Sequence, residues 1–270
     1  MKIVENEIMK PIKEFPSREK SQIQYVLTDI DDTLTVHGRL PAIAFSAMEK
    51  LQQNDIHVIP ITGRPAGWCD HIARMWPVAG LVGENGAFYF RYDTEKKKMI
   101  RRYFKSKEAR RQDQKKLSRL KEEILKQVPG SQLSADQAYR EADLAIDFCE
   151  DVLPLPKPSI DKIEQLFEHA GAQAKRSSIH VNGWFGSYDK LTMTKLLLKE
   201  IYNLDADQSN QHILYIGDSP NDCPMFEFFR HSVGVANIRE FEGELPSEPA
   251  WITEREGGYG FAEMTEVLLS

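Results

Sequence analysis

The two ends of the chain share one pattern, in which short apolar runs alternate with segments of helical periodicity. Four apolar runs have the length of a strand: residues 25–28, 56–61, 79–82 and 213–216. Three segments space their apolar residues as a helix does: residues 41–51, 64–75 and 189–201. Alternation of this kind predicts an α/β fold, with a parallel sheet that carries helices on both faces.

The middle of the chain, residues 90–186, follows a different pattern. Ser106 can act as the N-cap of a long helix that Pro129 ends, and residues 142–148 alternate apolar and polar side chains as a half-buried strand does. Because the first pattern resumes afterwards, we interpret this segment as an insertion. The predicted parts are an N-terminal extension (1–22), a core domain (23–89 and 187–270) and an inserted α+β cap domain (90–186).

The composition excludes several classes of protein. Of the 270 residues, 41% are hydrophobic and 28% are charged, which is typical of a globular chain and not of a disordered one. No run approaches the roughly 20 apolar residues that a membrane-spanning helix needs, and the first residues lack the form of a signal peptide. Three widely spaced cysteines do not form a disulfide framework. We therefore expect a cytoplasmic protein without a membrane partner.

The charge is unevenly distributed. The formal net charge is −6, yet residues 96–121 contain thirteen Lys or Arg against only Glu108 and Asp113. Such a basic segment can attract a phosphorylated ligand, although a solvated helix face explains the same residues. The acidic charge of the whole chain disfavours nucleic acid as a partner. The sequence does not indicate an oligomeric state.

Two acidic clusters follow two of the apolar runs. Asp29, Asp31 and Asp32 come directly after residues 25–28, and the sequence GDSPND, with Asp218 and Asp222, comes after residues 213–216. In open parallel sheets ligands bind at the carboxyl ends of the strands, so the two clusters can converge there. Like charges 4 Å apart repel by about 4 kcal/mol at a surface-like dielectric, so such a cluster needs a cation. Carboxylates beside a phosphate favour Mg²⁺.

Further residues suit a phosphate site. Thr62, Gly63 and Arg64 form a small polar turn after the second apolar run, and Gly63 permits close approach of the backbone to a ligand. Lys190 opens a predicted helix and can supply a fixed positive charge. Each feature alone also has a structural explanation, since acidic residues often cap helices and lysines usually lie at the surface.

The ordered set DIDDTL (29–34), TGR (62–64), Lys190 and GDSPND (217–222) resembles the four motifs of the haloacid dehalogenase superfamily. The resemblance implies a Rossmann-like core, and the place of the insertion is similar to that of the large type-two caps. Residues 82–87 and 257–261 resemble elements of the subgroup that contains sucrose phosphatase and mannosyl-3-phosphoglycerate phosphatase. The implied activity is a magnesium-dependent phosphatase that acts on a small phosphorylated metabolite, either a sugar phosphate or a glycosylated phosphoglycerate.

The resemblance also implies roles for individual residues. Asp29 would be the nucleophile that forms an aspartyl-phosphate, and Asp31 the general acid and base. Asp29, Asp218 and the backbone carbonyl of Asp31 would hold Mg²⁺. The phosphate-binding residues would be Thr62, Gly63, Lys190 and Asn221, with Arg64 and Asp222 in supporting positions.

Two alternatives remain open at the level of the sequence. Phosphomannomutases share the implied fold and nucleophile, but their fourth motif usually carries a glycine-rich insertion that GDSPND lacks. In a nucleic-acid-binding regulatory protein, the basic segment would be the working surface. Phosphate release, isomer formation from a hexose 1-phosphate and salt-dependent RNA binding would separate these functions.

Overall fold

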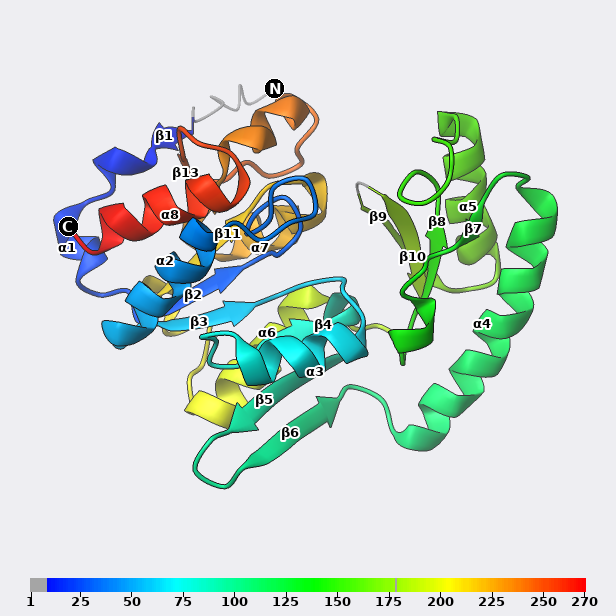
Figure 1. The fold of residues 1–270 in the computed structure, drawn as a ribbon, viewed down its shortest axis with the longest axis horizontal. Coiled ribbons are helices and arrows are strands. Elements are labelled where there is room, and N and C mark those ends of the chain that lie inside the picture. Colours follow the sequence, from blue (N-terminus) through cyan, green and yellow to red (C-terminus); the bar gives the residue numbers. More distant parts are fainter. Residues whose placement is uncertain (1–8, 178) are drawn as a thin grey trace.

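The computed structural model describes residues 9–177 and 179–270 (Figure 1). Its central sheet contains six parallel strands in the order β1-β13-β12-β11-β2-β3. These strands are β1 (Lys10–Pro11), β2 (Tyr25–Thr28), β3 (His57–Pro60), β11 (Ile213–Gly217), β12 (His231–Gly234) and β13 (Trp251–Ile252). The prediction of a parallel α/β sheet is confirmed.

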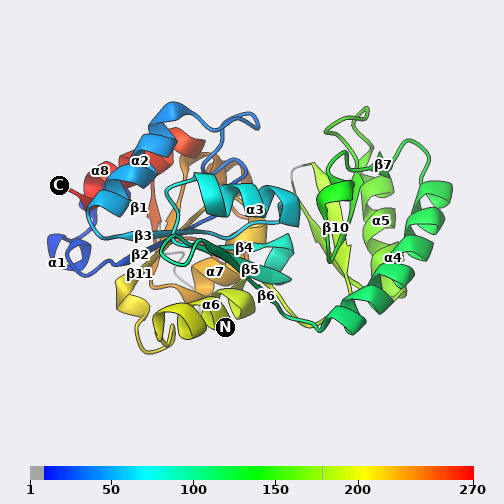
Figure 2. The same cartoon turned by 60° about the horizontal axis from the view of Figure 1, so that its bottom comes forward.

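Helices cover both faces of this sheet, because successive side chains of a strand point to opposite faces. Val26 of β2 belongs to a buried cluster that includes side chains of α2 (Ala42–Gln53), α3 (Ala66–Met75) and α8 (Gly257–Leu268). The next residue, Leu27, belongs to a second cluster with α6 (Lys190–Tyr202) and α7 (Cys223–Phe228). Figure 2 shows the two helical layers on either side of the strands. Among the described residues, no helix has the length and apolar character that crossing a membrane requires.

A hairpin extends the core beyond its predicted limit. Strands β4 (Leu81–Gly83), β5 (Phe88–Asp93) and β6 (Lys98–Tyr103) form an antiparallel sheet, and a parallel bridge joins Val82 to Ile61 after β3. Phe88 and Phe90 are buried in the same cluster as the side chains of α3. Because this hairpin packs on the core, we propose that the cap begins after residue 103 and not at residue 90.

The inserted segment forms an antiparallel sheet backed by two helices (Figure 1). The sheet order is β7 (Gln132–Leu133), β8 (Leu144–Asp147), β10 (His180–Trp184) and β9 (Gln173–Arg176). Apolar side chains of α4 (Lys107–Gln127) and α5 (Lys157–His169) form a separate buried cluster with this sheet. The Ser106 hydroxyl accepts a hydrogen bond from the amide of Ala109, as expected of the N-cap of α4. The opposite face of the sheet is turned toward the core.

Residues 10–15, which lie within the predicted N-terminal extension, are attached to the core. Ile12 and Phe15 are buried in the core, and the Phe15 ring lies against His231 and Trp251 at centroid distances of 5.3 and 5.2 Å. Strand β1 also pairs with β13, and the short α1 (Ser17–Lys20) follows it. The apolar side chains attach this segment to the core because their burial removes them from water. Residues 1–8 lie outside the described part of the chain.

Candidate active site

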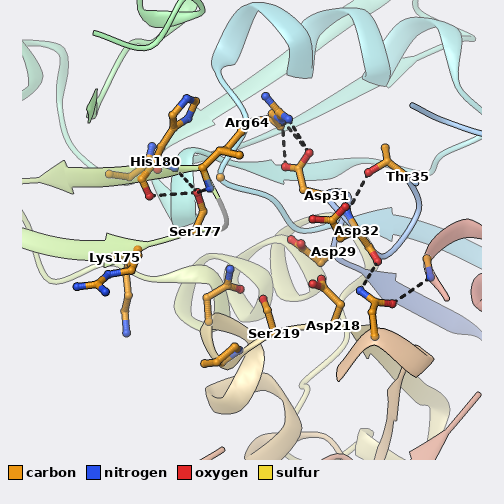
Figure 3. A pocket seen from close by; sticks show the side chains of 18 of the residues that line it. Asp29, Asp31, Asp32, Thr35, Arg64, Lys175, Ser177, His180, Asp218 and Ser219 are labelled. Carbon is orange, nitrogen blue, oxygen red and sulfur yellow. Dashed lines mark hydrogen bonds and ion pairs between the residues drawn. The ribbon is translucent and has the colours of Figure 1, made fainter. Parts of the chain in front are cut away.

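Asp29 and Asp218 lie close together at the carboxyl edge of the central sheet. They directly follow β2 and β11, which pair in parallel so that Thr28 lies opposite Ile216. One carboxylate oxygen each of Asp29, Asp218 and Asp222 lies within 4.8 Å of the other two, and all three residues are buried. The structure thus joins the two acidic motifs in one cluster (Figure 3).

Lys190 provides the positive charge next to this cluster. Its Nζ lies 2.9 Å from Oδ1 of Asp29, 2.9 Å from Oδ1 of Asn221 and 3.0 Å from Oδ1 of Asp222. Burial lowers the pKa of Lys190, but the carboxylates of Asp222 and Asp29 outweigh it, so the net shift is upward. The lysine is therefore charged at neutral pH, and the start of α6 fixes it in place.

One lysine does not neutralise three carboxylates. Burial raises the pKa of Asp29 to about 7, an effect that Lys190 only partly opposes. Burial, together with the charges of Asp222 and Asp29, raises the pKa of Asp218 well above its ordinary value. The cluster therefore favours any additional positive charge, whether a proton or a metal ion.

The donor set fits a hard divalent cation, which prefers oxygen ligands. Thr33 donates its hydroxyl proton to Oδ1 of Asp218 at 2.7 Å, which leaves Oδ2 available. Both oxygens of Asp222 are already engaged, one by the amide of Asp218 and the other by Lys190 and by the Tyr215 hydroxyl. Asp29 and Asp218 are thus the better ligands, while Asp222 holds the loop.

Asp31 faces away from the three carboxylates. Arg64 donates to both of its oxygens, from Nε at 3.0 Å to each and from Nη2 at 2.7 Å to Oδ1. The Arg64 guanidinium lies over the Trp68 ring at 4.6 Å, and its Nη1 lies 3.8 Å from Asp136 and 4.0 Å from Glu150 of the insertion. The candidate acid and base is therefore held by an arginine that also contacts the cap.

The predicted phosphate-binding residues divide into two groups. Gly63, Lys190 and Asn221 line the pocket. Thr62 is fully buried beneath it, and its hydroxyl oxygen accepts a hydrogen bond from the amide of Arg64 at 3.0 Å. A Cβ atom at Gly63 would meet the side chain of Asn85 at 3.1 Å, so the close packing of this turn favours glycine.

A buried network between core and cap was not predicted. Arg140 is paired with Asp136 at 2.8 and 2.9 Å and with Asp143 at 3.1 Å, and it donates to the carbonyl of Gly63 at 3.0 Å. The Glu84 carboxylate of the core accepts hydrogen bonds from the backbone amides of Ala66, Glu141 and Ala142. In the sequence, the only local sign of this network is the spacing of Asp136, Arg140 and Asp143, which lie three and four positions apart. No local pattern indicates the hydrogen bond from Arg140 to Gly63.

A pocket of about 500 Å³ lies between the carboxyl edge of the core sheet and the face of the cap sheet opposite its helices. Figure 3 shows Lys175, Ser177 and His180 on its cap side and the aspartates on its core side. His180 and Asn182 of β10 both line the pocket. Ser178, which strand alternation would place on the same face, lies outside the described residues. Sequence reasoning did not identify Lys175, Asn237, Glu240 or Glu256, which also line it.

The chain is similar to known proteins in part of its sequence and in its fold. Residues 26–125 match the family of haloacid dehalogenase-like hydrolases. No curated protein sequence matches the chain. Thermoplasma acidophilum protein 0175 has a similar fold, with a TM-score of 0.69 and 19% identity, over 92% of this chain and 98% of that one.

Two further solved structures share the fold. A putative HAD/COF-like hydrolase from Plasmodium vivax gives a TM-score of 0.67 at 18% identity and covers 94% of this chain and 99% of its own. The sucrose-phosphatase from Synechocystis gives a TM-score of 0.63 at 13% identity and covers 92% of this chain and 98% of its own. The chain is thus similar to haloacid dehalogenase-like hydrolases over residues 26–125, and it shares its fold with these solved structures.

Proposed function

We propose that this protein is a magnesium-dependent phosphatase that hydrolyses a small phosphorylated metabolite through an aspartyl-phosphate. The observation that carries the proposal is the contact of Lys190 with Asp29 inside a buried group of three carboxylates at the edge of the pocket. A carboxylate beside a fixed cation, in a pocket that also offers metal ligands, suits attack on a phosphate dianion.

Asp29 would attack phosphorus, and the bond from phosphorus to the leaving oxygen would break. Asp31 would donate a proton to that oxygen, then remove one from the water that hydrolyses the aspartyl-phosphate. Arg64 supports this role because its three hydrogen bonds fix the Asp31 carboxylate at the pocket wall. The hydrogen bonds from Arg64 to Asp31 would have to loosen when Asp31 carries the proton.

The remaining residues would bind the phosphoryl group and the metal ion. Lys190 and Asn221 would hold phosphoryl oxygens, and Gly63 would offer its amide, while Thr62 supports the turn from below. Asp29, Asp218 and the carbonyl of Asp31 would hold Mg²⁺. When bound, the ion would neutralise the carboxylates and polarise a phosphoryl oxygen.

The substrate would be a sugar phosphate or a glycosylated phosphoglycerate. The pocket volume lies within the range of about 300–1,000 Å³ that is usual for small-molecule sites. Among the proteins of similar fold, one is described as a sucrose-phosphatase in complex with sucrose and phosphate, and another as related to trehalose-6-phosphate phosphatase. Both descriptions concern phosphorylated sugars, which supports the proposed class.

The test is the release of inorganic phosphate from a panel of phosphorylated metabolites, with Mg²⁺ and with a chelator. We expect Mg²⁺-dependent release that Asp29→Asn abolishes, while Asp207→Asn, at an exposed carboxylate on the surface, retains it. Formation of an isomer from a hexose 1-phosphate without phosphate release would favour the phosphomutase. Full activity of a pure Asp29→Asn preparation would contradict covalent catalysis.

A further inference from the structure

In the part of the chain that the structure describes, five Lys and Arg residues line the pocket, and four of them are already paired with carboxylates of the protein. These four are Arg64, Arg140, Arg176 and Lys190. The fifth, Lys175, is exposed, and within residues 9–177 and 179–270 no carboxylate lies at ion-pair distance from it. Its charge is therefore available to a ligand.

The strand register directs Lys175 toward the pocket. In the antiparallel pair of β9 and β10, Lys175 lies opposite Asn182, and Arg176 lies opposite Val181. Val181 is buried in the cap cluster with side chains of α5, so it faces the helices. Because side chains alternate along a strand, Lys175 and Asn182 share the face that lines the pocket.

The core wall carries the opposite charge. Besides the acidic cluster, the pocket lining includes Asp32, Glu240 and Glu256, all from the core. An anionic group of a substrate, other than the phosphate that is transferred, would be repelled by these carboxylates and attracted by Lys175. Figure 3 shows Lys175 on the cap side of the pocket, across from the catalytic aspartates.

We propose that Lys175 binds a carboxylate on the leaving group, so that the preferred substrate is a phosphate ester of a hydroxy acid. A carboxylate brings one negative charge into the pocket, whereas a second phosphate would bring about two, which Asp32, Glu240 and Glu256 of the core wall would repel more strongly. This inference rests on the proposed phosphatase function and narrows its substrate class. Lys175 would then determine specificity without taking part in the transfer of the phosphoryl group.

The test uses 4-nitrophenyl phosphate as the reporter substrate and measures inhibition constants of two matched pairs of compounds. The first pair is glycerol 3-phosphate and 3-phosphoglycerate, and the second is glucitol 6-phosphate and 6-phosphogluconate. Within each pair only a CH₂OH group is replaced by a carboxylate, and the two pairs place that carboxylate at different distances from the phosphate. Both compounds of a pair carry the same phosphate, so the ratio of their inhibition constants cancels any effect of a substitution on phosphate binding.

In the unsubstituted protein we expect the carboxylate compound to bind about tenfold more tightly in at least one pair, a typical gain for a charge-assisted contact. Lys175→Gln should bring that ratio close to one, and Lys175→Arg should largely preserve it. Lys199→Gln is the matched control, since Lys199 is an exposed lysine of α6 outside the pocket.

Equal constants in both pairs, or a ratio that Lys175→Gln leaves unchanged, would overturn the inference. Absence of Mg²⁺-dependent turnover of 4-nitrophenyl phosphate would contradict the phosphatase itself, and the inference with it. Turnover combined with equal constants would contradict the carboxylate site alone. The two failures are therefore distinguishable.

Discussion

The Nζ atom of Lys190 lies 2.9 Å from Oδ1 of Asp29, although 161 positions separate the two residues in the chain. Both side chains are buried, so water screens this attraction only weakly. The contact fixes the orientation of the Asp29 carboxylate and places a permanent positive charge beside it. It also makes the site dependent on the correct packing of α6 against the end of β2.

Lys190→Met is expected to abolish phosphatase activity and to destabilise the fold. Breaking a buried ion pair by removing one partner costs about 3–5 kcal/mol, because the remaining carboxylates lose their compensating charge. For a chain of this size, that loss corresponds to a decrease in Tm of roughly 6–20 °C. Thermal unfolding measured in a chelator checks this, with Lys195→Met at an exposed ion pair as the control. A Tm equal to that of the unsubstituted protein would show that Lys190 does not compensate the cluster.

The metal-free protein should become less stable as the pH rises from about 4 to above 7. Burial raises the pKa of Asp29 to about 7 and that of Asp218 well above its ordinary value. In this range the unfolded chain has lost these protons while the folded chain retains them, so deprotonation favours unfolding. In the presence of a chelator, the Tm of the unsubstituted protein should therefore fall between pH 5.5 and pH 7.5. The decrease should be larger than that of Asp29→Asn, whose amide does not titrate.

Mg²⁺ should reverse this loss of stability at neutral pH. A ligand that binds only the folded state stabilises it by about 2.7 kcal/mol at a concentration of 100 times its Kd. We expect the rise in Tm with Mg²⁺ to be larger at pH 7.5 than at pH 5.5, because protons compete for the same carboxylates. Asp218→Asn should reduce the rise. An equal rise in that variant would place the ion elsewhere.

Arg64→Met is expected to lower kcat by about 100-fold, the lower end of what a positioned acid or base contributes, with a smaller effect on KM. The reason is that Arg64 makes three hydrogen bonds to the Asp31 carboxylate. Arg74→Met is the control, since Arg74 pairs with Asp70 on an exposed surface. A variant with unchanged kcat and raised KM would assign Arg64 to substrate binding instead.

Arg140→Met should destabilise the protein by about 3–5 kcal/mol, because Asp136 and Asp143 would remain buried without their partner. It should also raise KM for the phosphorylated substrate, since Arg140 donates to the carbonyl of Gly63, a residue proposed to bind the phosphate. Calorimetry and steady-state kinetics measure the two effects separately. Loss of stability without a change in KM would limit Arg140 to a structural role.

Local patterns predicted much of this molecule. Residues 25–28 and 213–216 are strands in the structure because a short apolar run followed by a polar turn leaves few other conformations for a buried segment. The two acidic motifs follow these strands directly, so their place at one edge of the sheet was predictable from chain direction alone. The helix capped by Ser106 was predictable for the same reason, since its signals lie within the segment itself.

Features that depend on distant contacts were not predictable. The hairpin of β5 and β6 was assigned to the cap, because nothing in its own sequence says that Phe88 and Phe90 pack on α3. The contact of Arg64 with both Asp31 and the cap, and the unpaired charge of Lys175, became visible only when charges from separate segments were placed together. The sequence by itself determined which elements form and where the acidic motifs lie along the chain, because periodicity and turn residues act locally. The tertiary structure decided which charges are paired, because pairing depends on distances between segments far apart in the chain.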